Sequence, residues 1–132
     1  FSPADALADS PEYAAYQKAL SAFRNRNYQE AERLFIEVLN QFPKGRQADH
    51  CHYWIGESNF AIGDYAKAIA AFKEVLTFSR SQKADDAQMK LGLAYMKMGQ
   101  TAQAKTEFQK LIDRYPGSEY TRRAQDYLAG MK

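Results

Sequence analysis

The chain has 132 residues, 45% of them hydrophobic and 14% aromatic, which is enough to fill the core of one domain and unlike a disordered segment. Its formal net charge of +2 is too small for the clustered basic surface of a nucleic-acid-binding domain. The charge is uneven, since residues 1–66 sum to −3 and residues 67–132 to +5. We interpret this as solvated helix faces, with a weakly basic C-terminal face for an acidic partner as the alternative.

Neither a membrane span nor a signal peptide is visible in this sequence. No apolar run approaches the roughly 18 residues that a spanning helix needs, so we expect no membrane insertion. The first residue is Phe1 rather than Met, and we therefore interpret the chain as a processed product or an excised domain. Missing targeting signals then say little about the parent protein.

Residues 1–10 are small, polar and proline-containing, and we expect them to be a linker or tail before a helical domain over residues 11–132. Ser10-Pro11-Glu12 predicts the start of the first helix, because serine is a good N-cap, proline suits the first helical position and an acid suits the first turn. Apolar periodicity and turn residues predict helices over residues 11–25, 28–41, 46–62, 65–78, 82–98, 101–114 and 119–130.

Glycine and proline separate these helices at regular places. Gly63 and Gly99 are expected to end a helix in the left-handed conformation and to lead into a short turn. In the first hairpin, residues 25–27 are expected to take this role through asparagine, which tolerates the conformation better than most residues. Pro43 and Pro116 stop the second helix of a hairpin.

The same pattern recurs three times at a spacing of 36 to 37 residues, with an alanine followed four residues later by a phenylalanine: Ala31 and Phe35, Ala68 and Phe72, Ala104 and Phe108. A helical hairpin cannot bury its apolar face alone, so neighbouring hairpins must stack. We therefore predict an all-α solenoid of three hairpins, over residues of about 12–45, 46–81 and 82–118, closed by a cap helix over residues 119–130.

Cys51 is the only cysteine, so no intramolecular disulfide can form and the redox compartment stays open. In the repeat register its position corresponds to Ala87 and Ala124. We therefore expect a small, buried side chain at residue 51 rather than a reactive thiol.

The first helix of each hairpin carries two stripes. One is rich in small residues and is predicted to pack against the second helix. The other has residues spaced by three, four and three positions, which share one helix face, and its character changes from hairpin to hairpin. Such variability is typical of a surface that binds a ligand. A concave groove formed by these faces would suit an amphipathic helix or an extended segment of a protein partner.

Ile55-Gly56 and Leu91-Gly92, together with the recurring tyrosine, glycine, alanine, phenylalanine and proline positions, resemble the tetratricopeptide repeat (TPR) over residues 12 to about 118. Hairpin one departs from the pattern, because it has Lys18-Ala19 in place of the Leu-Gly pair. The resemblance implies a right-handed α-solenoid that binds a protein or peptide along its concave face. It assigns this role to Tyr16, Phe23, Tyr53, Phe60, Met89, Leu93 and Met96 as apolar contacts, with Arg24, Glu57 and Lys97 fixing the partner's orientation. The alternative is that many of these side chains only pack between adjacent first helices.

A narrower resemblance is to the YbgF (CpoB) family of Tol-Pal-associated proteins, through its C-terminal repeat domain. It rests on the segments Tyr53-Trp54-Ile55-Gly56-Glu57, Phe42-Pro43-Lys44-Gly45, Tyr115-Pro116-Gly117-Ser118 and Tyr16-Gln17-Lys18-Ala19. It implies a periplasmic, non-catalytic scaffold that binds a TolA-like partner and coordinates outer-membrane constriction with peptidoglycan synthesis during cell division. That family also has a trimeric coiled coil, which this chain lacks, so its oligomeric state stays open.

Two alternatives differ in function. One is an adaptor of outer-membrane protein assembly or a chaperone-like module that receives unfolded clients. The other is a metal-binding protein that uses His50, Cys51 and His52, but the two histidines differ by about 200° around a helix axis and cannot converge on one ion alone. Because no catalytic motif or cofactor motif is present, we expect no enzyme activity, no cofactor and no metal.

Overall fold

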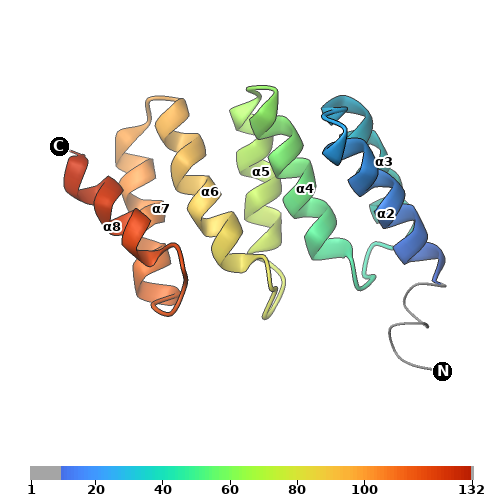
Figure 1. The fold of residues 1–132 in the computed structure, drawn as a ribbon. Helices are drawn as coiled ribbons and strands as arrows, with labels where there is room; N and C mark the ends of the chain where they lie inside the picture. Colours follow the sequence, from blue (N-terminus) through green and yellow to red (C-terminus); the bar gives the residue numbers. More distant parts are fainter. Residues whose placement is uncertain (1–9, 132) are drawn as a thin grey trace.

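The computed structural model describes residues 10–131, and in this part of the chain it contains helices and no strands. The predicted all-α class and solenoid architecture are confirmed. Successive helices pair antiparallel, and the pairs stack in chain order with one helix at the end (Figure 1). The helices are α2 (Pro11–Arg24), α3 (Tyr28–Gln41), α4 (Ala48–Ala61), α5 (Tyr65–Val75), α6 (Ala84–Lys97), α7 (Thr101–Arg114) and α8 (Thr121–Gly130).

The start of α2 follows the sequence signals. The side-chain oxygen of Ser10 accepts a hydrogen bond from the backbone N–H of Tyr13 at 3.0 Å, and Pro11 is the first helical residue. This N-cap satisfies a donor that the helix itself leaves free. The expected linker over residues 1–9 lies outside the described residues.

Several predicted helices extend two residues or more beyond the helices of the structure, three at their start and one at its end. The helices expected from residues 46, 82 and 119 begin two residues later, because the chain first makes a turn closed by hydrogen bonds from the N–H groups of Ala48, Ala84 and Thr121 to carbonyls three residues back. Helix α5 ends at Val75 rather than at residue 78. The N–H groups of residues 76–78 each bond to a carbonyl three residues back at 3.1 Å, which tightens the last turn.

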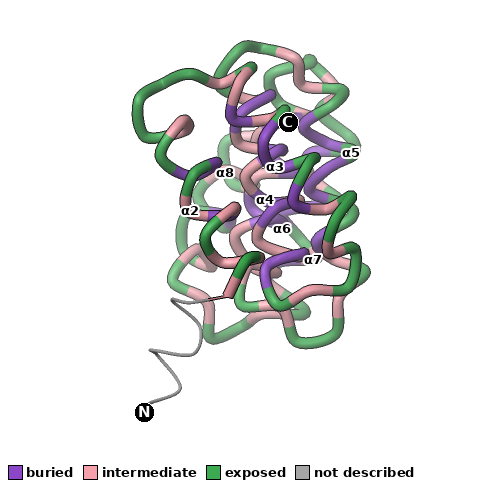
Figure 2. The backbone as a smooth tube through the Cα atoms, turned by 90° about the vertical axis from the view of Figure 1, so that its right-hand side faces the viewer, coloured by how far each residue is buried: buried purple, intermediate pink, exposed green. Residues whose placement is uncertain are grey.

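Large aromatic rings and small residues alternate in the core. Phe35, Phe72 and Phe108 are fully buried, and exposed residues are concentrated at the turns and along the outside (Figure 2). Gly56 and Gly92 lie directly beneath two of these rings, so a Cβ at either position would come within 2.5 Å or 2.4 Å of a ring carbon. The Leu/Ile-Gly pattern is therefore a packing requirement, since it lets the two helices of a hairpin approach closely.

Positive backbone φ angles mark two of the three turns within hairpins as expected, at Gly63 (84°) and Gly99 (73°). The prediction for the first hairpin is wrong in its detail, because the residue with positive φ is Arg26 (61°) and neither asparagine takes that conformation. Arg26 stands at the repeat position of the two glycines. Asn25 is instead the C-cap and Asn27 the N-cap of the flanking helices.

Candidate functional site

Helices α2, α4, α6 and α8 lie in a row on one side of the molecule (Figure 1), which we call the first-helix face. Aromatic contacts join α2 to α4 on this face. The indole N–H of Trp54 donates a hydrogen bond to the hydroxyl of Tyr16 at 2.9 Å, and the rings of Phe23 and Trp54 lie 4.8 Å apart. Two of the predicted contact residues, Tyr16 and Phe23, therefore hold neighbouring hairpins together, and Trp54, which sequence reasoning left out, connects them.

Charged side chains join α4 to α6 in the same way. The ammonium group of Lys90 lies 3.2 Å from Glu57 Oε1 and 4.8 Å from the centre of the Phe60 ring. Lys83, just before α6, places its ammonium group 4.9 Å from the Tyr53 ring and 5.3 Å from the Trp54 ring. These are cation–π distances. The sequence could have indicated both lysines by their position. Lys83 precedes the predicted stripe of the third hairpin, and Lys90 directly follows Met89 of that stripe.

Burial divides the ten predicted partner-binding residues into three groups. The buried residues are Tyr16, Tyr53 and Met89. The partly exposed residues are Phe23, Glu57, Phe60 and Leu93. The exposed residues, at the ends of α2 and α6, are Arg24, Met96 and Lys97. The surface that a partner can reach is therefore smaller than the predicted stripe, and the role of these residues stays a prediction.

The two buried tyrosines are held in their neutral form. Burial raises the pKa of Tyr16 to about 12, although the hydrogen bond from Trp54 acts in the opposite direction. Burial also raises the pKa of Tyr53, and the nearby negative charge of Glu57 adds to this effect. Both phenols therefore serve as neutral packing groups, and that of Tyr16 also accepts the hydrogen bond from Trp54.

A shallow depression of about 320 Å³ lies on α8, lined by Arg123, Asp126 and Tyr127. The Tyr127 ring in its lining stacks on the buried Phe108 ring, with 5.1 Å between the ring centres and an interplanar angle of 7°. Arg123 and Asp126 supply one charge of each sign at its rim. The sequence does not predict this depression, because its pattern indicates only a cap helix over residues 119–130.

The histidines that suggested a metal site make separate contacts. His50 bonds through Nδ1 to Asp49 Oδ1 at 3.0 Å, whereas the His52 ring packs 5.8 Å from the Phe78 ring. Cys51 between them is fully buried, and burial raises the pKa of its thiol to about 12. Within residues 10–131, no three His, Cys, Asp or Glu side chains are grouped so that they could hold a metal ion.

Comparison with solved structures gives the class of the protein. The chain is similar to the Sgt2 TPR domain from Aspergillus fumigatus, with a TM-score of 0.73, 20% identity, and 91% of this chain and 78% of that chain covered. It is also similar to MamA, with a TM-score of 0.70, 20% identity, and 92% of this chain and 77% of that chain covered. A third neighbour is the C-terminal TPR-containing domain of a Plasmodium falciparum FK506-binding protein, with a TM-score of 0.69, 19% identity, and 94% of each chain covered. At these identities the likeness shows the fold, which is that of a TPR domain.

The chain belongs to the YfiO family, described as an outer membrane lipoprotein family, which it matches over residues 8–132. No curated protein matches the sequence significantly. None of the helices in residues 10–131 is long and apolar enough to cross a bilayer. The predicted TPR class is confirmed, whereas the narrower resemblance to the YbgF (CpoB) family is not.

Proposed function

We propose that this protein is a non-catalytic scaffold of the bacterial envelope that binds a segment of a partner protein on its first-helix face. The observation that carries the proposal is the fold itself, a stack of hairpins whose first helices form one continuous face. Such stacks present extended binding surfaces, and their rigidity keeps the entropic cost of binding low. The family's description as an outer membrane lipoprotein supports a place in the envelope, on its periplasmic side.

The reachable part of this face is mixed in character. Phe60 and Leu93 offer partly exposed apolar surface, while Arg24 and Lys97 offer exposed positive charge. Lys83 is also without an acidic partner among the described residues, although its ammonium lies over two rings. A partner segment with apolar and acidic side chains would complement this surface.

Two clients are candidates. The family match favours the adaptor interpretation, in which the client is an outer-membrane protein during assembly. The resemblance of the repeat segments favours a TolA-like partner and a role in cell division. The absence of enzyme activity is part of the proposal in either case.

The test is titration calorimetry of the purified chain with two probes, an unfolded porin fragment and a periplasmic TolA fragment. The variant Phe60→Ala/Leu93→Ala removes apolar surface from the face without touching the buried Tyr53. We expect it to weaken binding of the preferred probe about tenfold or more, as central apolar contacts do. Ile36→Ala, which truncates an exposed apolar side chain on α3, is the matched control.

Comparable affinity in the double variant and the control, with thermal stability preserved in both, would remove the first-helix face as the binding site. The probe that binds identifies the client class. Binding of neither probe would contradict both clients.

A further inference from the structure

We propose that the edge formed by the three turns within hairpins lies against an anionic phospholipid surface. This turn edge consists of residues 25–27, 62–64 and 98–100, which lie in a row at the top of Figure 1. The inference rests on the proposed place of the protein in the envelope. The turn edge shares the exposed residues Arg24, Met96 and Lys97 with the first-helix face but not Phe60 or Leu93.

Exposed apolar side chains gather at the turn edge. Among residues 10–131, the large hydrophobic side chains that are most exposed are Ile36, Ile62, Met96 and Met98. Three of these four lie at or next to the turn edge. Ile62 and Met98 are 47% and 41% exposed and follow the last residues of α4 and α6. An open depression of about 560 Å³ lies between them, lined also by Tyr65.

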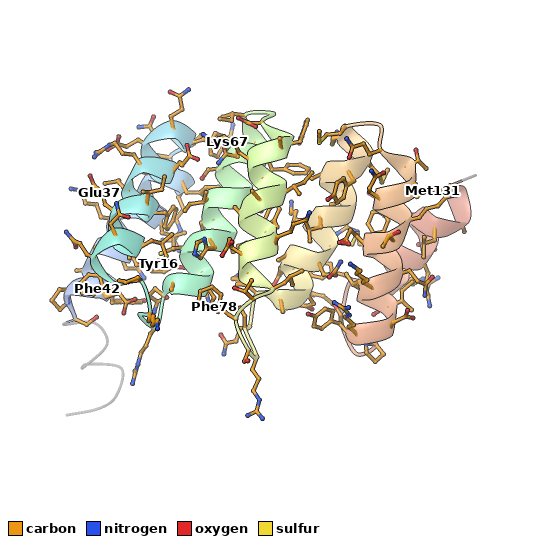
Figure 3. The ribbon with its side chains drawn as sticks, turned by 180° about the vertical axis from the view of Figure 1, so that it is seen from behind. Tyr16, Glu37, Phe42, Lys67, Phe78 and Met131 are labelled. Carbon is orange, nitrogen blue, oxygen red and sulfur yellow. The ribbon has the colours of Figure 1, made fainter. Side chains whose placement is uncertain are left out.

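Positive charges flank this apolar surface. Arg24, Arg26 and Lys97 are exposed, and within residues 10–131 none of them forms an ion pair. Lys67 lies near the same edge (Figure 3) but is 3.5 Å from Glu32. The acid in the turns, Asp64, accepts a hydrogen bond from the backbone N–H of Lys67, which caps α5. Asp64 also forms no ion pair among residues 10–131, so three cations and one carboxylate leave the turn edge with a net positive charge.

Arg26 gives a second, independent observation. It adopts a φ of 61° at the repeat position where Gly63 and Gly99 adopt 84° and 73°. Glycine takes this conformation without strain, whereas an arginine there is disfavoured. The first turn thus places a cation at a position where the other two turns have glycine, the residue that the backbone prefers.

Apolar tips beside unpaired cations match the boundary between acyl chains and phosphate groups, where lysine and arginine stems lie along apolar surface and their charges meet phosphates. The opposite edge of the molecule differs. Its aromatic residues Phe42 and Phe78 are partly buried (Figure 3), and the nearby carboxylates of Asp49 and Asp85 accept hydrogen bonds from the loops. This loop edge also has exposed cations without an ion pair among residues 10–131, namely Lys44, Arg46 and Arg80. Its loops carry none of the exposed large hydrophobic side chains, so an anionic bilayer would meet the turn edge, where apolar tips and cations occur together.

The test is flotation of the full chain with vesicles of phosphatidylcholine alone or mixed with phosphatidylglycerol. We expect binding only to the mixed vesicles, and we expect added salt to weaken it. Arg26→Gly should reduce the partition coefficient about fivefold, the effect of one basic residue at an anionic surface. Arg80→Gly is the matched control, because Arg80 is also exposed and also has a positive φ, of 59°, but lies in the loop between α5 and α6.

Both glycine variants relieve the same strain and remove the same charge, so both should unfold at a higher temperature than the parent chain. Ile62→Ser should also weaken vesicle binding, whereas Ile36→Ser should not. Equal vesicle binding by Arg26→Gly and Arg80→Gly, or no binding of the parent chain to the mixed vesicles, would overturn the inference. Phe60→Ala/Leu93→Ala should keep vesicle binding, so this inference and the proposed function can fail separately.

Discussion

The carboxylate of Glu12 occupies the space that a side chain at residue 45 would need. A Cβ at Gly45 would lie 1.9 Å from Glu12 Oε2. From this position the carboxylate accepts hydrogen bonds from the backbone N–H groups of Arg46 at 3.1 Å and Gln47 at 3.0 Å. The first turn of α2 thereby supports the start of α4, across more than thirty residues of sequence.

The starts of α6 and α8 are held in a similar way, by an aspartate and a serine in place of the glutamate. Ser81 donates to Asp49 at 2.5 Å and accepts from the N–H of Lys83 at 3.1 Å. Ser118 donates to Asp85 at 2.6 Å and accepts from the N–H of Tyr120 at 3.1 Å. In the repeat register, Glu12 with Gly45 corresponds to Asp49 with Ser81. Glutamate is one methylene longer than aspartate, so its carboxylate reaches the backbone N–H groups directly and takes the place of the serine hydroxyl.

This correspondence predicts a coupling between residues 12 and 45. Gly45→Ser should destabilise the parent chain, because it displaces the carboxylate from two backbone donors. In the Glu12→Asp background the same change should be stabilising, since it recreates the Asp-Ser joint. We expect a coupling free energy of about 1–2 kcal/mol, measured by urea denaturation of the four proteins in the cycle. Additive effects would contradict the relationship.

Close packing at the glycines beneath the phenylalanine rings predicts a second effect. Gly56→Ala should reduce the free energy of unfolding by about 1–3 kcal/mol, because its Cβ would lie 2.5 Å from a carbon of the Phe72 ring. Gly117→Ala is the control, since a Cβ there meets nothing within 4 Å. Ala19 occupies the equivalent position in hairpin one, where it is fully buried. A neutral Gly56→Ala would contradict the packing requirement in the second hairpin.

The carboxyl of Asp49 predicts a pH dependence of stability. Burial alone would raise its pKa, but the hydrogen bond from Ser81 and the charge and hydrogen bonds of His50 hold the pKa below the usual value. Because the pKa is depressed in the folded state, this stabilisation is present above the unfolded pKa of about 4 and is lost as the pH falls through the folded value.

Asp49→Asn should therefore lose less stability than the parent chain between about pH 5 and pH 3, measured by thermal unfolding across that range. Asp113→Asn removes an exposed carboxylate on α7 and is the control. Parallel pH profiles for the parent chain and Asp49→Asn would contradict the role of this carboxyl in stability.

The Cys51 thiol should be unreactive in the folded protein, because burial raises its pKa to about 12 and its side chain is fully enclosed. We expect an aromatic disulfide reagent to modify it only as the chain unfolds. Cys51→Ala should change the free energy of unfolding by less than about 1.5 kcal/mol, since the equivalent residues are Ala87 and Ala124. Rapid labelling under native conditions would show that the joint between α3 and α4 opens readily.

The sequence by itself determined the repeat, the helix order and the core. Phe35, Phe72 and Phe108 recur with small residues at fixed spacing, and each hairpin must bury the same apolar face, so one pattern specifies the packing three times over. The prediction of a small buried residue at Cys51 followed from the same register. The sequence does not determine the starts of α4, α6 and α8, because the turns before them depend on hydrogen bonds that no local pattern requires.

Only the tertiary structure decided which residues of the first-helix face a partner can reach. Helical spacing places Tyr16, Tyr53 and Met96 on one face, but their exposure depends on side chains that arrive from neighbouring hairpins, such as Trp54 and Lys83. The same is true of Glu12, whose partners lie 34 and 35 residues away. Contacts between hairpins depend on how the units are placed against each other, and periodicity within one helix carries no information about that placement.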